Sequence, residues 1–225
     1  MPELQKEVIT QEDIERELRL ADTEDRDADF RDKIIQEVNL SERTINTGLN
    51  FEEAKILGSA YFGRTVIYGD LNFKAATINN ALYLGEGIIK GELNCQGAEI
   101  GEVLNLIGVI VEKNVNLEQA KIKGFLGLNK TDIKGGINSK KITVQDLKSV
   151  PGTIKGDIYL QEAKVRGSVD FEEAFVEGLI NLQRAVIGGI LNLRNTDIKD
   201  FFILKNAVIQ GEIQLEGLKC KGKIS

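Results

Sequence analysis

The sequence repeats an eleven-residue pattern, and this repeat restricts the fold more than any other feature of the chain. Between Leu71 and Ile122, large apolar side chains recur at positions 1, 3 and 8 of each unit, and a small residue, often Ala, stands at position 6. A spacing of two residues is the period of a β-strand, whereas an amphipathic helix needs spacings of three and four throughout. Each unit is therefore expected to contain two very short strands separated by corners.

The same template extends over most of the chain. It starts at Val38 and ends with the unit that opens at Ile213, which gives seventeen units, and the unit that opens at Ile137 is one residue short. Position 6 alternates between a series that is nearly all Ala and a mixed series, so the full period is 22 residues and two units make one coil with four faces. The sequence thus predicts an all-β solenoid, a four-faced parallel β-helix of about eight coils, with stacked strands about 4.8 Å apart. Parallel crossovers strongly favour the right-handed sense.

Glycine recurs at position 10 of the units, for example at Gly58, Gly69 and Gly91. Because glycine tolerates a positive φ, which tight corners commonly need, we expect these residues to form left-handed corners between strands. The high glycine content is therefore predicted to mark corners, not disorder.

Asn stands between the two inward residues in many units, as in LNF (71–73), LNC (93–95) and LNL (104–106). Such steps resemble the pentapeptide-repeat proteins, in which Ala, then Asp or Asn, then Leu follow one another. This chain departs from that pattern by an eleventh residue per pair of steps, and by Leu or Val where the family usually has Ala. The resemblance covers roughly residues 38–225. It implies a four-faced right-handed β-helix and, since some members inhibit or protect DNA gyrase by resembling DNA, it implies one candidate function.

Residues 1–37 are expected to form an acidic, helical N-terminal cap or arm before the β-helix of residues 38–225. The segment TQEDIERELRL (10–20) predicts a short helix with Thr10 as N-cap and with Ile14 and Leu18 on one face. A second helix is predicted from about Phe30 to Glu37. We expect the helices to cover the first coil, because a solenoid needs a polar-faced cap. An arm that engages a partner is the alternative.

The charge is unevenly divided along the chain. Of the net charge of −6, residues 1–32 carry −7 and the remainder carries +1. A nearly neutral rod argues against a DNA mimic, and the absence of a basic stripe argues against a nucleic-acid partner.

No apolar run is long enough for a signal peptide or a membrane span. Cys95 and Cys220 fall on inward positions too far apart for a disulfide, so we expect two buried thiols and a cytoplasmic location.

Two apolar surfaces are candidates for interaction. Position 7 places Val66, Ile88 and Ile110 outward in three successive coils, a candidate lateral interface that either the N-terminal helix or a partner should cover. At the other end no polar cap is visible. The candidate terminal interface there comprises Ile203, Val208, Leu215, Leu218 and Ile224. An open end predicts a homo-oligomer formed end to end, further polymerisation, or a longer natural protein.

Two further features are expected to be structural. Asn residues recur outward at intervals of 22, from Asn50 to Asn138, and stacked Asn side chains hydrogen-bond along such rods. The irregular coil at about residues 137–157 contains Pro151 and is a possible place for a grafted site. We expect a kinked corner there instead.

The chain lacks the residues that known solenoid enzymes use. It has no His, on which the hexapeptide acyltransferases and β-helical carbonic anhydrases depend. Acidic pairs such as Glu52 with Glu53 and Glu172 with Glu173 fall on corners, where solvated acids are ordinary. We therefore predict no enzyme, no catalytic residue, no cofactor and no metal site. The predicted function is a non-catalytic repeat scaffold or protein–protein interaction module; the alternatives are a DNA-mimicking regulator of a topoisomerase and a self-assembling, bactofilin-like filament subunit.

Overall fold

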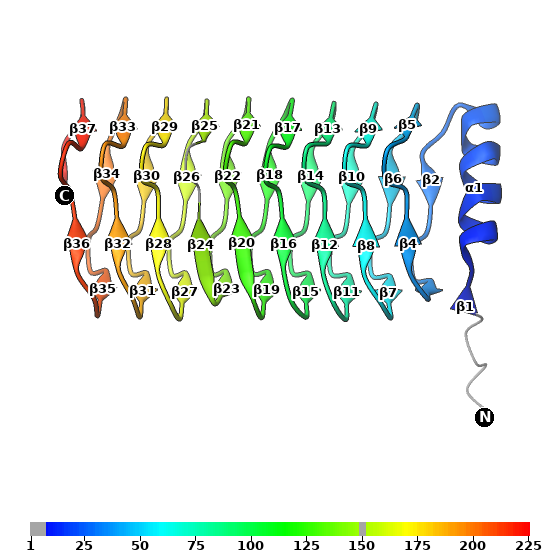
Figure 1. The fold of residues 1–225 in the computed structure, drawn as a ribbon, viewed down its shortest axis with the longest axis horizontal. Helices are drawn as coiled ribbons and strands as arrows, with labels where there is room; N and C mark the ends of the chain where they lie inside the picture. The colour runs from blue at the N-terminus through cyan, green and yellow to red at the C-terminus, as the bar shows by residue number, and fades with distance from the viewer. Residues whose placement is uncertain (1–7, 149–151) are drawn as a thin grey trace.

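The chain folds into a parallel β-solenoid with four faces, which confirms the predicted fold class (Figure 1). The structure is a computed structural model that describes residues 8–148 and 152–225. One helix, α1 (Gln11–Glu24), lies across the N-terminal end, and the coils stack away from it along the rod (Figure 1). Each face is one sheet of strands that are almost all two residues long.

Face A contains ten strands: β1 (Val8–Ile9), β3 (Ile34–Ile35), β7 (Lys55–Ile56), β11 (Thr77–Ile78), β15 (Glu99–Ile100), β19 (Lys121–Ile122), β23 (Thr143–Val144), β27 (Lys164–Val165), β31 (Val186–Ile187) and β35 (Val208–Ile209). Face B contains nine: β2 (Ala28–Asp29), β6 (Leu49–Asn50), β10 (Leu71–Asn72), β14 (Leu93–Asn94), β18 (Val115–Asn116), β22 (Ile137–Asn138), β26 (Ile158–Tyr159), β30 (Ile180–Asn181) and β34 (Phe202–Ile203). 

Face C contains nine: β4 (Val38–Asn39), β8 (Ala60–Tyr61), β12 (Leu82–Tyr83), β16 (Leu104–Asn105), β20 (Phe125–Gly127), β24 (Asp146–Lys148), β28 (Val169–Asp170), β32 (Leu191–Asn192) and β36 (Ile213–Gln214). Face D contains nine: β5 (Thr44–Ile45), β9 (Val66–Ile67), β13 (Ile88–Ile89), β17 (Ile110–Val111), β21 (Asp132–Ile133), β25 (Thr153–Ile154), β29 (Phe175–Val176), β33 (Asp197–Ile198) and β37 (Lys219–Cys220). The chain visits the faces in the order B, A, C, D in each coil.

The register confirms that two units make one coil. Leu71 pairs with Leu49 on one side and with Leu93 on the other, so like positions stack at intervals of 22 residues. The interval shortens to 21 between Leu126 and Leu147, where the sequence is one residue short, and returns to 22 when Leu147 pairs with Val169. The missing residue is thus absorbed in one corner, and the strands on either side keep their register.

The inward columns form one continuous core. Leu71 and Phe73, which the repeat places inward, are both completely buried, and so is the small residue Ala76. Near the N-terminal end the rings of Phe30, Phe51 and Phe73 stack, with centroid distances of 4.7 and 4.9 Å. Such aromatic pairs contribute roughly 0.5–1.5 kcal/mol beyond the burial of their area. The first coils are therefore held together by both the backbone ladders and this stack.

The second helix predicted from about Phe30 to Glu37 is wrong. These residues belong to the first coil: β2 precedes them, and β3 (Ile34–Ile35) lies among them. Ala28, Phe30 and Ile35 are inward and buried, as positions 1, 3 and 8 of a repeat unit would be. The unit is one residue short and has Lys33 at the small position, and the spacing of Phe30 and Ile34 imitates a helical face. The first coil therefore begins at Ala28, and faces B, C and D each have nine strands where about eight coils were predicted.

The glycines at position 10 have a different role from the predicted one. The left-handed backbone lies at position 5, where φ is 58° at Glu53, 56° at Arg64 and 54° at Ala75. At position 10 the requirement is space: a Cβ added to Gly69 would lie 2.4 Å from the backbone nitrogen of Gly48 in the preceding coil. At Gly69 the preceding coil thus approaches too closely for a side chain to fit without a shift of the backbone.

We expect Gly69→Ala to lower the free energy of unfolding by roughly 1–3 kcal/mol, the usual cost of forcing extra volume into a packed site. The matched control is Gly63→Ala, because a Cβ at Gly63 would meet only the Gly85 carbonyl oxygen at an ordinary 3.7 Å. The control should change stability by less than about 0.5 kcal/mol. Urea unfolding followed by circular dichroism measures both, and equal losses in the two variants would contradict the steric explanation.

Candidate interaction surfaces

The N-terminal end of the rod is closed by α1. The Thr10 side chain accepts the N–H of Asp13, and the Asp13 carboxylate accepts the Thr10 N–H at 2.8 Å, so Thr10 is the N-cap that the sequence predicted. Ile14 and Ala21 on the helix are completely buried, and Leu18 packs against the core. The apolar face of the helix therefore covers the first coil.

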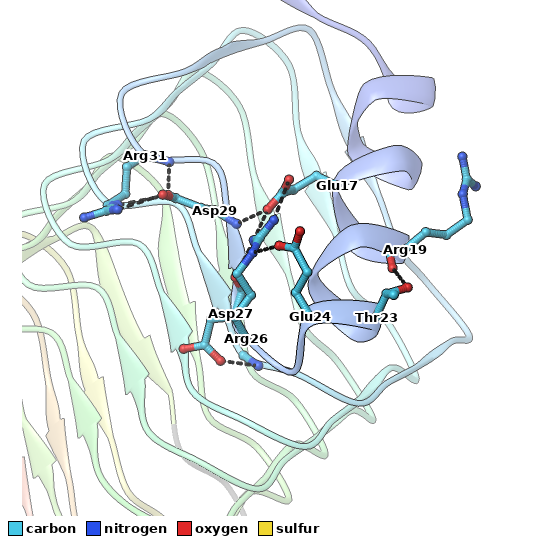
Figure 2. Close-up of polar contacts among 9 residues, drawn as sticks. Glu17, Arg19, Thr23, Glu24, Arg26, Asp27, Asp29 and Arg31 are labelled. Carbon is cyan, nitrogen blue, oxygen red and sulfur yellow. Dashed lines mark hydrogen bonds and ion pairs between the residues drawn. The ribbon is translucent and has the colours of Figure 1, made fainter.

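Side chains of α1 also satisfy backbone groups at the exposed edge of the first coil. On face B the Asp29 N–H donates to Glu17 at 2.9 Å, and Arg26 donates to the same carboxylate oxygen at 2.5 Å (Figure 2). On face C the Gln11 side-chain amide accepts from the Asn39 N–H at 3.1 Å and donates to the Asn39 carbonyl at 3.0 Å. On face A, β1 pairs with β3 as an extra strand. On three of the four faces, the outer edge of the first coil thus has a hydrogen-bonding partner from α1 or from β1.

The charged groups of α1 and the loop after it stabilise one another's ionised forms. Burial raises the pKa of Glu17, but the hydrogen bonds from Arg26 and from the Asp29 N–H outweigh it and leave that pKa below its usual value. Arg26 also donates to Glu24 at 2.7 Å, and both carboxylates raise the pKa of its guanidinium (Figure 2). Glu17 and Arg26 therefore remain charged at neutral pH, and the helix is held to face B by a charged network.

The C-terminal end has no equivalent cover within the described residues. Inward side chains of the last coil are open to solvent: Leu215 is 41% exposed, and Ile213 is 42% exposed. All five predicted terminal residues belong to the last coil, but they lie on different faces of it. Leu218 is inward and half-buried, Ile203 and Val208 are outward on β34 and β35, and Ile224, 54% exposed, bridges to Phe202.

The open end also presents unpaired backbone groups of both kinds. On face C, the carbonyls of Glu212 and Gln214 accept from the preceding coil, as Leu191 donates to Glu212 at 3.0 Å. On face A, the N–H groups of Val208 and Gln210 donate to the preceding coil, as Val208 does to Ala185 at 2.8 Å. In the part of the chain that the structure describes, Ile213 on face C and Ile209 on face A therefore each present both an N–H and a carbonyl at the open edge.

The lateral stripe of Val66, Ile88 and Ile110 lies on face D. These side chains stack through the pairing of β9, β13 and β17, and each is half-buried. Helix α1 lies across the end of the rod, so it does not cover the stripe (Figure 1). The polar residues Thr44 and Asp132 follow in the same column on either side. The stripe is therefore short, bounded and still available to a partner.

The outward Asn column on face B is structural, as predicted. Each Asn side-chain oxygen accepts the backbone N–H two residues later; for Asn50 the donor is Glu52, at 3.0 Å. The side chains also bond from coil to coil, since Asn72 donates to Asn50 at 3.1 Å. In the irregular coil, Pro151 lies outside the described residues, whereas the strands that flank it keep their pairing.

A groove on face A is a feature that the sequence did not reveal. It has a volume of about 400 Å³ and crosses β11, β15, β19 and β23. Its sides are two outward columns: Thr77, Glu99, Lys121 and Thr143 on the strands, and Asn79, Gly101, Lys123, Gln145 and Arg166 just after them. Gly101 leaves a gap in the second column. That glycine, at a position where neighbouring coils have side chains, was the available signal.

Three side chains considered for chemistry, Cys95, Cys220 and Glu52, differ in burial and pairing. Cys95 is completely buried, and burial raises the pKa of its thiol to about 12, so the nucleophilic thiolate is not formed near neutral pH. Cys220 is only half-buried, contrary to the prediction, because no further coil covers it. Glu52 is bound by Lys74 at 2.7 Å. Among the described residues, no helix is long and apolar enough to span a membrane.

No protein-family model matches the sequence, and no curated protein matches it significantly.

Proposed function

We propose that this protein is a non-catalytic scaffold of the pentapeptide-repeat type, which acts through protein–protein contacts and first binds a second copy of itself through its C-terminal coil. The contrast between the two ends carries this proposal. At one end the first coil is closed by α1 and β1, with Ile14 fully buried. At the other, Leu215 and Ile224 expose an apolar surface beside unpaired backbone groups, which is characteristic of an interaction site.

The open end is suited to a second copy because it is self-complementary. Ile209 on face A and Ile213 on face C lie on the last strands of their sheets, and each presents both an N–H and a carbonyl at the open edge. A two-fold axis perpendicular to the rod would place such an edge antiparallel to the same edge of the other copy, with donors opposite acceptors. Such an isologous contact closes on itself and gives a dimer.

The alternatives receive less support. A head-to-tail filament needs two open ends, and α1 would have to leave the first coil to provide the second. A DNA mimic needs free acids along the rod, but several are bound by lysines one coil away, as Glu99 is by Lys121 at 2.6 Å. Two free cysteines support a cytoplasmic location for the scaffold. In the proposed dimer the lateral faces remain free for other partners.

Sedimentation velocity tests the dimer. We expect the unchanged chain to dimerise, and Leu215→Asp to weaken the dimer roughly a hundredfold, because a charge replaces an apolar side chain at the centre of both copies' contact surface. Leu215 is 41% exposed, so the monomer should tolerate the substitution. Ile88→Asp, on face D, is the matched control and should leave the dimer intact. A monomer at every concentration of the unchanged chain, or a dimer unaffected by Leu215→Asp, would refute the proposal.

A further inference from the structure

We infer that the groove on face A binds an acidic peptide segment of a partner protein, in the polyproline II conformation with acidic residues at every third position. This inference identifies a class of partner for the proposed scaffold and uses a surface separate from the dimer contact. The groove is lined by residues of β11 to β23 and by Arg166, whereas the dimer contact is formed by the last coil.

The charge of the groove favours an anionic ligand. Lys121, Lys123 and Arg166 line it, and Glu99 is the one acidic side chain among its lining residues. Glu99 is bound by Lys121 at 2.6 Å. Lys123 and Arg166 are exposed, and neither forms an ion pair with any residue that the structure describes. Two cations are thus available to a carboxylate-bearing partner.

The spacing of the two cations selects the conformation of the peptide. Lys123 and Arg166 stand two coils apart in one column, which is about 9.6 Å at the usual strand spacing. In an extended strand, side chains on the same side recur every second residue, at about 6.7 Å, or at about 13 Å for the next. In a polyproline II helix every third residue returns to the same side after about 9.3 Å. The polyproline II repeat of about 9.3 Å therefore matches the distance of about 9.6 Å between Lys123 and Arg166, whereas the repeat of an extended strand does not.

The sheet beneath the groove is consistent with this mode of binding. Its backbone is already paired from coil to coil: the Lys121 N–H donates to Ala98 at 2.8 Å, and the Thr143 N–H donates to Ala120 at 2.9 Å. A peptide therefore cannot bind by adding a strand. A polyproline II peptide keeps its carbonyls free, and the side-chain amides of Asn79 and Gln145 line the groove as donors. No lining residue is aromatic, so the groove offers no platform for stacking nucleobases.

Fluorescence anisotropy with a labelled peptide tests the inference. The probe is a Glu-Pro-Ser repeat of about twelve residues, which favours polyproline II and places Glu at every third position. A peptide of the same composition with its Glu residues in one block is the control, and we expect it to bind at least about fivefold more weakly. Lys123→Glu and Arg166→Glu should each lower the affinity for the periodic peptide roughly tenfold or more. Lys155→Glu, an exposed cation on face D, should leave the affinity within about twofold.

Equal affinity for the two peptides, no binding of the periodic peptide, or tighter binding of a thymidine oligonucleotide would each overturn the inference. Circular dichroism establishes that the charge variants remain folded. The titration is made with both the unchanged chain and Leu215→Asp, and we expect the same affinity for both. Loss of peptide binding and loss of self-association are therefore observed separately.

Discussion

Phe51→Ala is expected to lower the free energy of unfolding by about 3–5 kcal/mol, the range for removing a fully buried Phe side chain. Phe51 is completely buried, with the rings of Phe30 and Phe73 stacked above and below it at 4.7 and 4.9 Å. Because ladders on four faces hold neighbouring coils at a fixed spacing, the coils cannot move together to fill the space that the ring leaves. Urea unfolding followed by circular dichroism gives the change in free energy.

The control for this prediction is another aromatic side chain in the same part of the rod. Tyr68 is 58% exposed, so Tyr68→Ala should change stability by no more than about 0.5 kcal/mol. Native-state hydrogen exchange should show that the Phe51→Ala loss is concentrated in the first coils, because a solenoid is stabilised by contacts between neighbouring repeats. A loss below about 1 kcal/mol for Phe51→Ala would mean that the aromatic stack does not hold these coils together.

Ile14→Asp is expected to release α1 from the first coil and to cause the chains to associate through the N-terminal end of the rod. Ile14 is completely buried between the helix and the first coil, and an unpaired carboxylate there costs roughly 3 kcal/mol or more, beyond the lost apolar contact. Without the helix, the Asp29 N–H and both backbone groups of Asn39 lose their partners. An uncovered sheet edge favours association between chains. Sedimentation velocity should therefore show species larger than those of the unchanged chain.

Leu20→Asp is the matched control for this prediction, because it makes the same change on the same helix at a side chain that is 45% exposed. We expect it to leave both the melting temperature and the association state nearly unchanged. If Ile14→Asp lowered stability without increasing association, the helix would contribute stability but would not be what keeps the first coil from pairing with another chain.

The repeat was sufficient to predict the fold because its information is local. Leu71 and Phe73 stand two residues apart and share one face, and Leu93 occupies the same position one coil later. Each coil therefore specifies the next, and the inward columns are determined wherever the template is met. The prediction failed around Phe30, where Lys33 replaces the small residue and a short unit imitates a helical spacing. The spacing of Phe30 and Ile34 fits both a helix and a coil of short strands, so the local pattern alone cannot distinguish the two. The pairing with the neighbouring coil decides between them.

The glycines at position 10 show a second limit of prediction from the sequence. Glycine at position 10 was interpreted through φ, the property that a single residue expresses alone. In the structure the reason for Gly69 is the backbone of Gly48, which belongs to another coil and is 21 residues earlier in the chain. The left-handed positions, such as Arg64 with φ of 56°, have ordinary side chains that give no signal in the sequence.

By itself the sequence determined which side chains face inward, that two units form a coil, and that apolar residues gather in the last coil. Only the tertiary structure decided that α1 closes one end, that the last strands of faces A and C have no partner on their outer edge among the described residues, and that Lys123 and Arg166 border one groove. The physical reason is the range of the interactions. Side-chain alternation within a strand is set by adjacent residues, whereas a groove or an unpaired edge depends on which coils lie beside one another and on where the stacking stops.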